Sequence, residues 1–242
     1  MIINDTQVQT LIEALPYLRD FKDKTIVVKY GGNAMLNDQI KNKVLQDVVF
    51  LQCAGMRPVV VHGGGPEITA MLMQAGKKSE FVSGLRVTDA ESVGIAEMAL
   101  VGKINTDLVA RLNTLGGRAV GLNGKDANLV QAKKHLADVY ENGEVNLVDI
   151  GYVGNVEHVN TDLIEVLLAN GFIPVIAPTG VGSSGETYNI NADSVAGEIA
   201  GALKAESLIS LTDISGILMD KDDPDTLIPH ITVKGTEELI AK

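Results

Sequence analysis

Residues 58–68 read PVVVHGGGPEI, a short run of β-branched residues followed by three glycines and a proline. The apolar run predicts a buried strand, the glycines predict a tight loop, and Pro66 suits the first position of a helix. Residues 25–32, TIVVKYGG, show the same strand and glycine loop earlier in the chain. A strand, a glycine loop and a helix in succession are typical of a parallel sheet that is covered by helices.

The same alternation continues along the rest of the chain. Helical spacing of apolar residues predicts helices, and runs of Val, Ile and Leu predict strands between them. Helices are expected at 37–54, 89–112, 159–170 and 193–204, and strands at 118–122, 172–177 and 207–212. Residues 128–157 predict a β-hairpin, and Pro16 predicts a kink or a restart in an N-terminal helix. The expected fold class is therefore α/β, with a parallel sheet that helices cover on both faces.

The chain is acidic, with 20 Lys and Arg against 31 Asp and Glu, which gives a formal charge of −11. Nucleic-acid binders and proteins of anionic membrane surfaces need a basic field, so this charge argues against both. Anions must then be bound by a few placed charges and backbone N–H groups. The N-terminus does not resemble a signal peptide, and no apolar stretch approaches the ~20 residues that span a bilayer. We therefore expect a cytoplasmic protein with neither a nucleic-acid nor a membrane partner.

Several well-known catalytic motifs do not occur in the sequence. A P-loop, the nucleophile motif of α/β-hydrolases and a histidine-built metal motif are all missing. Gly180, Gly182 and Gly185 match the dinucleotide fingerprint, but a predicted strand follows them where that fingerprint needs a helix, so we interpret them as a hairpin turn. The single cysteine, Cys53, lies among apolar residues and is predicted to be a buried thiol rather than a nucleophile.

The two glycine loops lie where a parallel sheet binds its ligands. Gly31 and Gly32 end one predicted strand, and Gly63, Gly64 and Gly65 end the next. Ligands bind beyond the carboxyl ends of such strands, and glycine lets backbone N–H groups approach an anion closely. Each loop alone is equally well a tight turn, but two of them at neighbouring strand ends favour a phosphate site.

Three charged side chains accompany these loops. Lys29 precedes the first loop, and the apolar residues before it favour an ammonium group at the ligand edge of the sheet. Arg86 is either a guanidinium that grips a carboxylate with two parallel hydrogen bonds or an ordinary surface arginine. Asn189, Asn191 and Asp193 alternate where a strand meets a helix, so they share one face. Asp193 is then either the N-cap of that helix or a carboxylate that holds a lysine near a phosphate.

Five motifs together resemble the amino acid kinase family. They are KYGGNAM at 29–35, HGGGPEI at 62–68, GLRVT at 84–88, NINAD at 189–193 and LTDISGIL at 211–218. Their order is that of the family members that phosphorylate N-acetyl-L-glutamate. GLRVT in particular separates these members from the aspartate, uridylate, carbamate and glutamate 5-kinases. The resemblance runs from about residue 9 to the last residue.

This resemblance implies a three-layer αβα sandwich with a mainly parallel central sheet. Residues 1–204 would form an N-terminal lobe for N-acetyl-L-glutamate and oligomerisation, and residues 205–242 would begin the nucleotide-binding lobe. The implied reaction transfers a phosphoryl group from ATP to the side-chain carboxylate of N-acetyl-L-glutamate, with Mg²⁺ held mainly by the nucleotide phosphates. The product, N-acetyl-L-glutamyl 5-phosphate, belongs to arginine biosynthesis.

The resemblance also implies roles for single residues. Lys29 would stabilise the transition state, and Asp193 would orient that lysine. The transferring phosphoryl group would be bound by the N–H groups of Gly31, Gly32 and Gly63. The acetylglutamate would be bound by Gly64, Gly65, Arg86 and Asn189, with Arg86 on its α-carboxylate. The nucleotide would be bound by Asp213, Ile214, Ser215, Gly216, Ile217 and Leu218, and no protein metal site is implied.

Two further features of the family concern completeness and assembly. Its pattern continues, past the segment that matches 237–242, into a G-G-M-x-x-K-type motif with a second transition-state lysine, so we expect an incomplete C-terminal end. The N-terminal helix either packs on its own lobe or, as in arginine-inhibited members, builds a hexamer from dimers; arginine feedback would accompany the hexamer. Two alternatives stay open: a related kinase for another N-blocked acidic amino acid of the aminoadipate type, and a non-catalytic amino-acid-sensing module.

Overall fold

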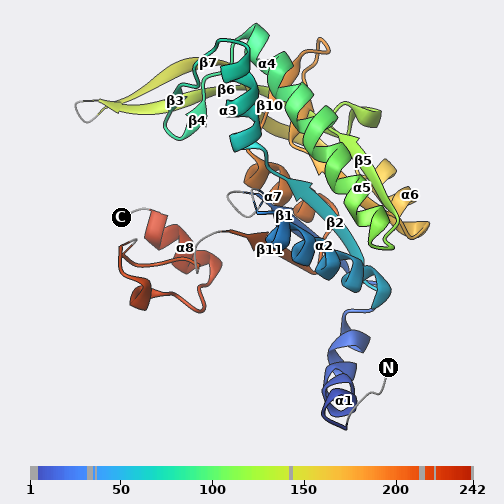
Figure 1. Cartoon of the computed structure of the whole chain (residues 1–242). Coiled ribbons are helices and arrows are strands. Elements are labelled where there is room, and N and C mark those ends of the chain that lie inside the picture. The colour runs from blue at the N-terminus through green and yellow to red at the C-terminus, as the bar shows by residue number, and fades with distance from the viewer. Residues whose placement is uncertain are drawn as a thin grey trace. The chain divides into compact units, whose positions relative to one another are not determined.

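The computed structural model describes residues 5–31, 35, 37–141, 144–212, 216–220 and 222–240. The chain forms two compact units, residues 1–211 and residues 212–242 (Figure 1). The first unit holds the central sheet, and the second holds α8 (Val233–Ile240) and the short 3₁₀ turn η4 (Pro224–Thr226). The lobe boundary expected after residue 204 concerns which substrate each part binds, and it stays a prediction. Within the described ranges, no helix is both long and apolar enough to cross a membrane.

A five-stranded parallel sheet forms the centre of the first unit. Across the sheet the order is β11 (Ser207–Leu211), β1 (Thr25–Tyr30), β2 (Arg57–His62), β8 (Ile173–Ala177) and β5 (Ala119–Asn123). Each neighbouring pair is parallel, so all carboxyl ends lie at one edge. In the β1–β2 pair, Lys29 stands beside Val61 and Tyr30 beside His62. This register brings the residues that follow both strands, the two glycine loops, to neighbouring positions.

Side chains of the sheet alternate between two apolar cores. Val59 and Val61 of β2 share one core with α6 (Asp162–Ala169) and α7 (Ala192–Ala202). Val60 shares the other core with helices of the opposite layer. These are α2 (Asp38–Cys53), α3 (Gly65–Gln74), α4 (Ala90–Glu97) and α5 (Thr106–Thr114). A parallel sheet buried on both faces needs such β-branched runs, and the three-layer αβα fold is confirmed.

The helix predicted over 89–112 is wider at its centre than expected. α4 continues into a π-helical segment, η2 (Met98–Asn105), and then into α5. Because apolar spacing reports the average helical period, it does not register a local π turn. Asn105, the last residue of η2, donates a hydrogen bond from Nδ2 to the carbonyl oxygen of Val175 in β8, 2.8 Å away. This contact ties the wide turn to the central sheet.

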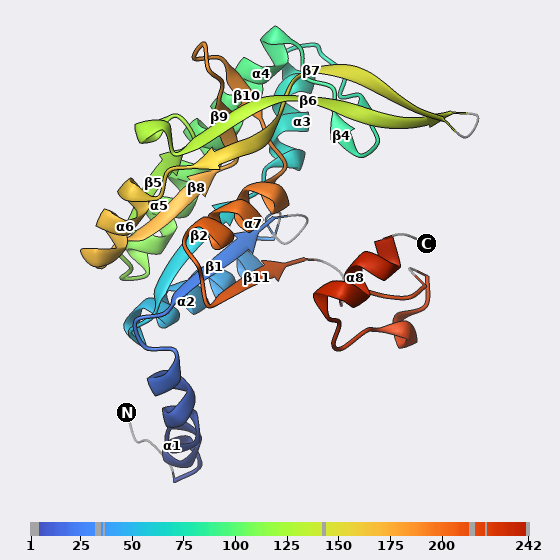
Figure 2. The same cartoon turned by 180° about the vertical axis from the view of Figure 1, so that it is seen from behind.

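A second group of strands extends the first unit (Figure 2). The predicted hairpin is confirmed as β6 (Val130–Glu141) and β7 (Glu144–Val159). Together with β9 (Thr179–Val181) and β10 (Thr187–Asn189) these strands form a closed barrel in the order β10, β7, β6, β9. Gly185 lies in the turn between the antiparallel β9 and β10, so the hairpin interpretation of the glycine fingerprint is also confirmed. The short strands β3 (Phe81–Val82) and β4 (Leu85–Arg86) pack on β6 and β7 through a small apolar cluster.

The structure corrects two expectations about single residues. Cys53 is exposed rather than buried, because it is the last residue of α2, where the helix has run past its buried residues Leu45, Val48 and Val49. α1 (Asp5–Asp20) is one helix that runs through Pro16, so the restart is wrong, and the kink stays a prediction. A proline removes a helical hydrogen bond, but the helical assignment continues past it.

Candidate functional site

A cavity of about 280 Å³ opens where β1 and β2 end. Its walls come from the glycine loops, the β3–β4 hairpin, the end of β10 and the first turn of α7. Nine of its lining residues were singled out from the sequence, namely Lys29, Gly31, Gly63, Gly64, Gly65, Arg86, Asn189, Asn191 and Asp193. These nine residues come from four separate sequence segments, 29–31, 63–65, 86 and 189–193, which the fold gathers around one pocket.

Lys29 and Asp193 meet at one side of this pocket. Lys29 Nζ lies 3.1 Å from Asp193 Oδ1; the lysine side chain is 13% exposed and the aspartate side chain 62%. Asp193 is not the N-cap of α7, so that interpretation is wrong: Asn191 is the cap, and its Oδ1 accepts hydrogen bonds from the N–H groups of Asp193 and Ser194. Because Asn191 takes the capping role, the Asp193 carboxylate is left to pair with the lysine.

The glycine loops approach each other so closely that side chains would not fit easily. A Cβ atom on Gly31 would lie 3.3 Å from Lys29 Cε, and one on Gly63 would lie 3.4 Å from the Cα of Gly31. A Cβ on Gly64 would lie 2.6 Å from Leu100 Cδ2 in η2. Glycine at these positions keeps the backbone itself as the lining of the pocket.

The three glycines of the second loop differ in whether their N–H groups are already engaged. The N–H of Gly63 donates to the carbonyl oxygen of Tyr30, 2.8 Å away, and so extends the β1–β2 ladder. In this structure it is therefore engaged within the sheet, and its expected role in binding the phosphoryl group stays a prediction. Gly64 is the N-cap of α3 and Gly65 its first residue, and the first N–H groups of a helix have no helical acceptor. Gly64 and Gly65 therefore place N–H groups without a helical acceptor at the pocket that they line.

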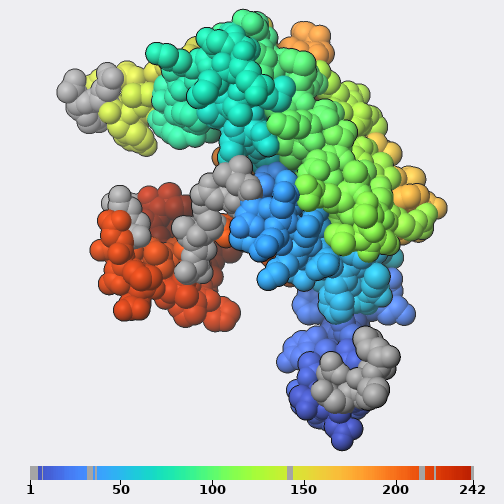
Figure 3. All heavy atoms as spheres, in the orientation of Figure 1, coloured from blue at the N-terminus to red at the C-terminus, as the bar shows by residue number. Residues whose placement is uncertain are grey.

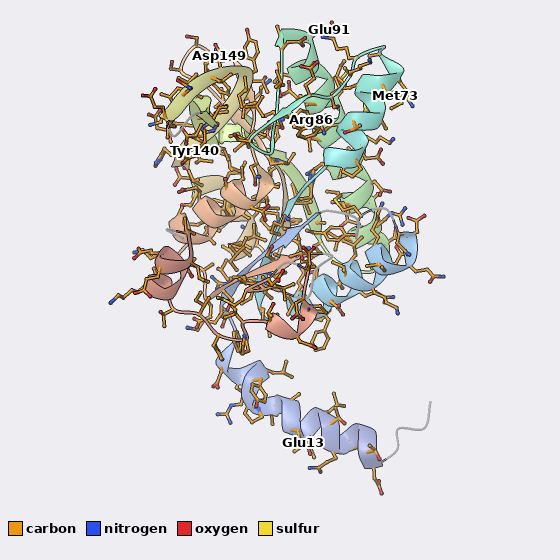
Figure 4. All side chains as sticks on the ribbon, turned by 90° about the vertical axis from the view of Figure 1, so that its left-hand side faces the viewer. Glu13, Met73, Arg86, Glu91, Tyr140 and Asp149 are labelled. Atoms are coloured by element: carbon orange, nitrogen blue, oxygen red, sulfur yellow. The ribbon has the colours of Figure 1, made fainter. Side chains whose placement is uncertain are left out.

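Arg86 is buried against the start of α3 (Figure 4). Its Nη2 donates to the carbonyl oxygen of Gly65 at 3.0 Å and to Thr69 Oγ1 at 2.9 Å, and its Nη1 donates to Ser79 Oγ. The Phe81 ring lies 4.7 Å from the guanidinium carbon. Burial lowers the pKa of Arg86 below its ordinary value, but a guanidinium stays charged at neutral pH. The surface-arginine interpretation is wrong, because this side chain is 8% exposed and held at the pocket.

His62 and Asn105 form a buried pair beneath the glycine loop, and sequence reasoning missed both. His62 Nδ1 lies 2.9 Å from the carbonyl oxygen of Gly63, and His62 Nε2 lies 3.1 Å from Asn105 Nδ2. The same Nδ2 donates to Val175, which fixes the orientation of the amide. Nε2 of His62 must then accept, so Nδ1 carries the proton. A histidine directly before three glycines and an asparagine inside an apolar helix were the available signals.

The state of His62 makes stability depend on pH. Burial lowers the pKa of His62 to about 4, whereas an unfolded chain would titrate near 6.5. Between these values the unfolded state binds more protons, so the free energy of unfolding should fall as the pH is lowered, by about 1.4 kcal/mol per pH unit. Urea unfolding from about pH 7 to about pH 5 measures this slope. The Lys134 ammonium lowers the pKa of Asp149, so this carboxylate does not contribute to the slope over the measured range.

Two matched histidine variants test whether His62 causes the change of the free energy of unfolding with pH. His62→Gln should flatten it over this window, and His158→Gln, at an exposed position on β7, should leave it unchanged. Equal slopes in the wild type and in His62→Gln would show that another group controls acid stability.

Among the described residues that line this pocket, none is a predicted nucleotide-binding residue. Gly32, Asp213, Ile214 and Ser215 lie outside the described residues. Gly216, Ile217 and Leu218 belong to the second unit, where Leu218 forms a bridge with Leu227 and Gly216 has a φ of +144°. Their role in nucleotide binding stays a prediction.

Comparison with known proteins gives a consistent relationship. Residues 24–242 match the amino acid kinase family. An acetylglutamate kinase from Moorella thermoacetica is 56% identical over 230 residues, which are 95% of this chain and 78% of that protein. One from Methanocaldococcus jannaschii is 52% identical over 233 residues, 96% of this chain and 78% of that protein.

A solved structure extends the comparison to the fold. N-acetylglutamate synthase from Neisseria gonorrhoeae, complexed with coenzyme A and N-acetyl-glutamate, superposes with a TM-score of 0.74 and 27% identity. The match covers 88% of this chain and 47% of the synthase chain. Because a synthase shares this architecture, the fold alone does not decide between activities.

Proposed function

Because the chain belongs to the amino acid kinase family, and matches an acetylglutamate kinase along 95% of its length, we propose that it phosphorylates N-acetyl-L-glutamate in the pocket of the glycine loops. ATP is the phosphoryl donor. The acceptor is the side-chain carboxylate, and the product is N-acetyl-L-glutamyl 5-phosphate, in arginine biosynthesis. One observation carries the placement: Lys29, paired with Asp193, shares a pocket with the buried Arg86 and with open N–H groups at the start of α3.

The acceptor needs no general base. A glutamate side-chain carboxylate has an ordinary pKa of about 4.3 and is ionised at neutral pH. One of its oxygens attacks the γ-phosphorus, a new O–P bond forms, and the bond to the ADP oxygen breaks. The obstacle is repulsion between a carboxylate and a polyphosphate, so catalysis consists of positioning and charge neutralisation.

The charges of the pocket suit that task. The Lys29 ammonium would neutralise the transferring phosphoryl group, and Asp193 would hold it in position from 3.1 Å away. The N–H groups of Gly64 and Gly65 would donate to the same group, and Gly31 would leave room for it. Arg86 would bind the α-carboxylate of the substrate, and Asn189, at the end of β10, would contact the acetylglutamate from across the pocket.

In this proposal Mg²⁺ is bound by the nucleotide and not by protein side chains. Among the described residues no group of three or more His, Cys, Asp or Glu side chains is placed to hold a metal ion. Asp193, the one acidic side chain among the described lining residues, is already paired with Lys29. The side chains of the pocket therefore do not make a protein metal site, and we propose that the ATP phosphates hold the ion.

Trapping the product tests the proposed activity. Hydroxylamine converts an acyl phosphate to a hydroxamate, so protein incubated with ATP, Mg²⁺ and N-acetyl-L-glutamate should yield a hydroxamate. The expected order of rates is N-acetyl-L-glutamate well above N-acetyl-L-2-aminoadipate, with no product when ATP is omitted. A faster rate with the aminoadipate derivative would identify that compound, not N-acetyl-L-glutamate, as the preferred substrate. Tight binding of acetylglutamate without hydroxamate would favour an amino-acid sensor.

Assembly and location remain proposals of the same resemblance. The apolar side chains Val8, Leu11, Ile12 and Leu15 of α1 (blue in Figure 3) are 44–61% exposed, as expected of a helix that packs against another chain. We propose a homo-oligomer in which α1 takes part: a dimer, or in its largest form a hexamer built from dimers. Arginine feedback and a cytoplasmic location are predictions that accompany it.

A further inference from the structure

We propose that His62 and Asn105 are positioning residues that aim the N–H of Gly64 at the transferring phosphoryl group. The inference rests on the proposed function and adds a layer behind the pocket. His62 is completely buried and Asn105 is 4% exposed, so both act through their hydrogen bonds rather than by touching substrate.

The key element is the peptide group between Gly63 and Gly64. Its carbonyl oxygen, on Gly63, accepts a hydrogen bond from His62 Nδ1 at 2.9 Å. Its N–H, on Gly64, belongs to the same plane, and the described peptide bonds include no cis form. In a trans peptide the N–H points away from the carbonyl oxygen. A carbonyl held inward by His62 therefore turns the Gly64 N–H outward, to the pocket that Gly64 lines.

Asn105 fixes the histidine in turn. Its Nδ2 donates to His62 Nε2 at 3.1 Å and to the carbonyl oxygen of Val175 at 2.8 Å. This leaves the proton on Nδ1, the only tautomer that can donate to Gly63. Space for the amide comes from Gly121 in β5, where a Cβ atom would lie 2.1 Å from Asn105 Oδ1.

The π-helical segment η2 contacts both Gly63 and Gly64 of the glycine loop, the first through His62 and the second directly. From η2, Asn105 supports the Gly63 carbonyl through His62, and Leu100 and Ile104 lie against Gly64 itself. π turns are rare and are frequent at functional sites. The local widening thus links the core of the sheet to the backbone that would bind the phosphoryl group.

Two histidine variants separate positioning from bulk structure. Asn carries its amide nitrogen near the place of histidine Nδ1, whereas Gln carries it near the place of Nε2. His62→Asn should keep the hydrogen bond to Gly63, and His62→Gln should lose it. A misdirected donor is expected to lower kcat by about 10²-fold in His62→Gln, with recovery of most of that loss in His62→Asn. The KM for acetylglutamate should change little in either, because Arg86 is untouched.

Asn105→Ala has a matched control on the same helix layer. Asn113 of α5 also bonds to the sheet, donating to the carbonyl oxygen and accepting from the N–H of Ala119. Both alanine variants should shift the midpoint of urea unfolding to a lower concentration, and only Asn105→Ala should lower kcat, again by about 10²-fold. Hydroxamate formation, KM and urea unfolding are measured for each. Equal kcat in His62→Asn and His62→Gln, or in Asn105→Ala and wild type, overturns the inference, whereas an inactive wild type overturns the proposed function instead.

Discussion

Replacing Lys29 by Met is expected to lower kcat by about 10²–10³-fold and to leave the affinity for N-acetyl-L-glutamate near that of the wild type. Met keeps the length of the side chain and removes the ammonium group that faces the pocket. The charge matters most when negative charge develops on the transferring phosphoryl group, so the loss falls on kcat rather than on binding. Asp193 is left without its partner but is 62% exposed, so water can solvate it and the fold should persist.

Lys24→Met is the matched control for this prediction. Lys24 lies directly before β1, and its Nζ pairs with Glu206 Oε2 at 3.0 Å, with both side chains about half exposed. An exposed ion pair contributes at most about 1 kcal/mol, and this lysine does not line the pocket. Steady-state hydroxamate assays should therefore find Lys24→Met close to wild type. A kcat for Lys29→Met within a factor of a few of wild type would remove Lys29 from the chemistry.

Replacing Arg86 by Lys is expected to raise the KM for N-acetyl-L-glutamate rather than to lower kcat. The guanidinium reaches Gly65, Thr69 and Ser79 at once, and an ammonium group cannot reproduce that fork. The variant should raise the KM for N-acetyl-L-glutamate by about 10–100-fold, the equivalent of one charged hydrogen bond of about 1.5–3 kcal/mol. The KM for ATP should change much less, because the proposed contact is to the α-carboxylate of the acceptor.

Arg118→Lys controls for the loss of a stacked arginine as such. Arg118 also lies over an aromatic ring, that of Phe172 at 4.2 Å, and donates to the carbonyl oxygen of Asn170. It is exposed and is not among the lining residues of the pocket. Urea unfolding of both variants separates packing from recognition. An unchanged KM in Arg86→Lys, with a fall in stability alone, would leave Arg86 a purely structural residue.

Much of the fold was predictable because its signals are local. The β-branched runs at β1 and β2, the glycines after them and the proline at the start of α3 each report on their own neighbourhood. Their order implies a parallel sheet, since parallel strands need a crossover connection between them. The π turn of η2 was not predictable, because tertiary contacts of Asn105 fix it and apolar spacing does not.

Some features of the site could likewise be predicted from local sequence, and others could not. Lys29, the glycine loops and Arg86 were found from their places at strand ends, but the sequence could not choose between Asp193 as a helix cap and Asp193 as a lysine partner. That choice depended on Asn191, which takes the cap, and so on the precise residue at which α7 begins. The direction of the Gly63 N–H likewise follows from the register of β1 against β2, which no local pattern specifies.

The division of work between Arg86 and Lys29 is tested most directly by one calorimetric titration, of N-acetyl-L-glutamate into the wild type and the two variants. We expect Lys29→Met to bind with a Kd within about threefold of wild type, and Arg86→Lys to bind at least about tenfold more weakly. If the two variants instead lose affinity equally, or if only Lys29→Met loses it, then the pocket does not bind its substrate in the way proposed.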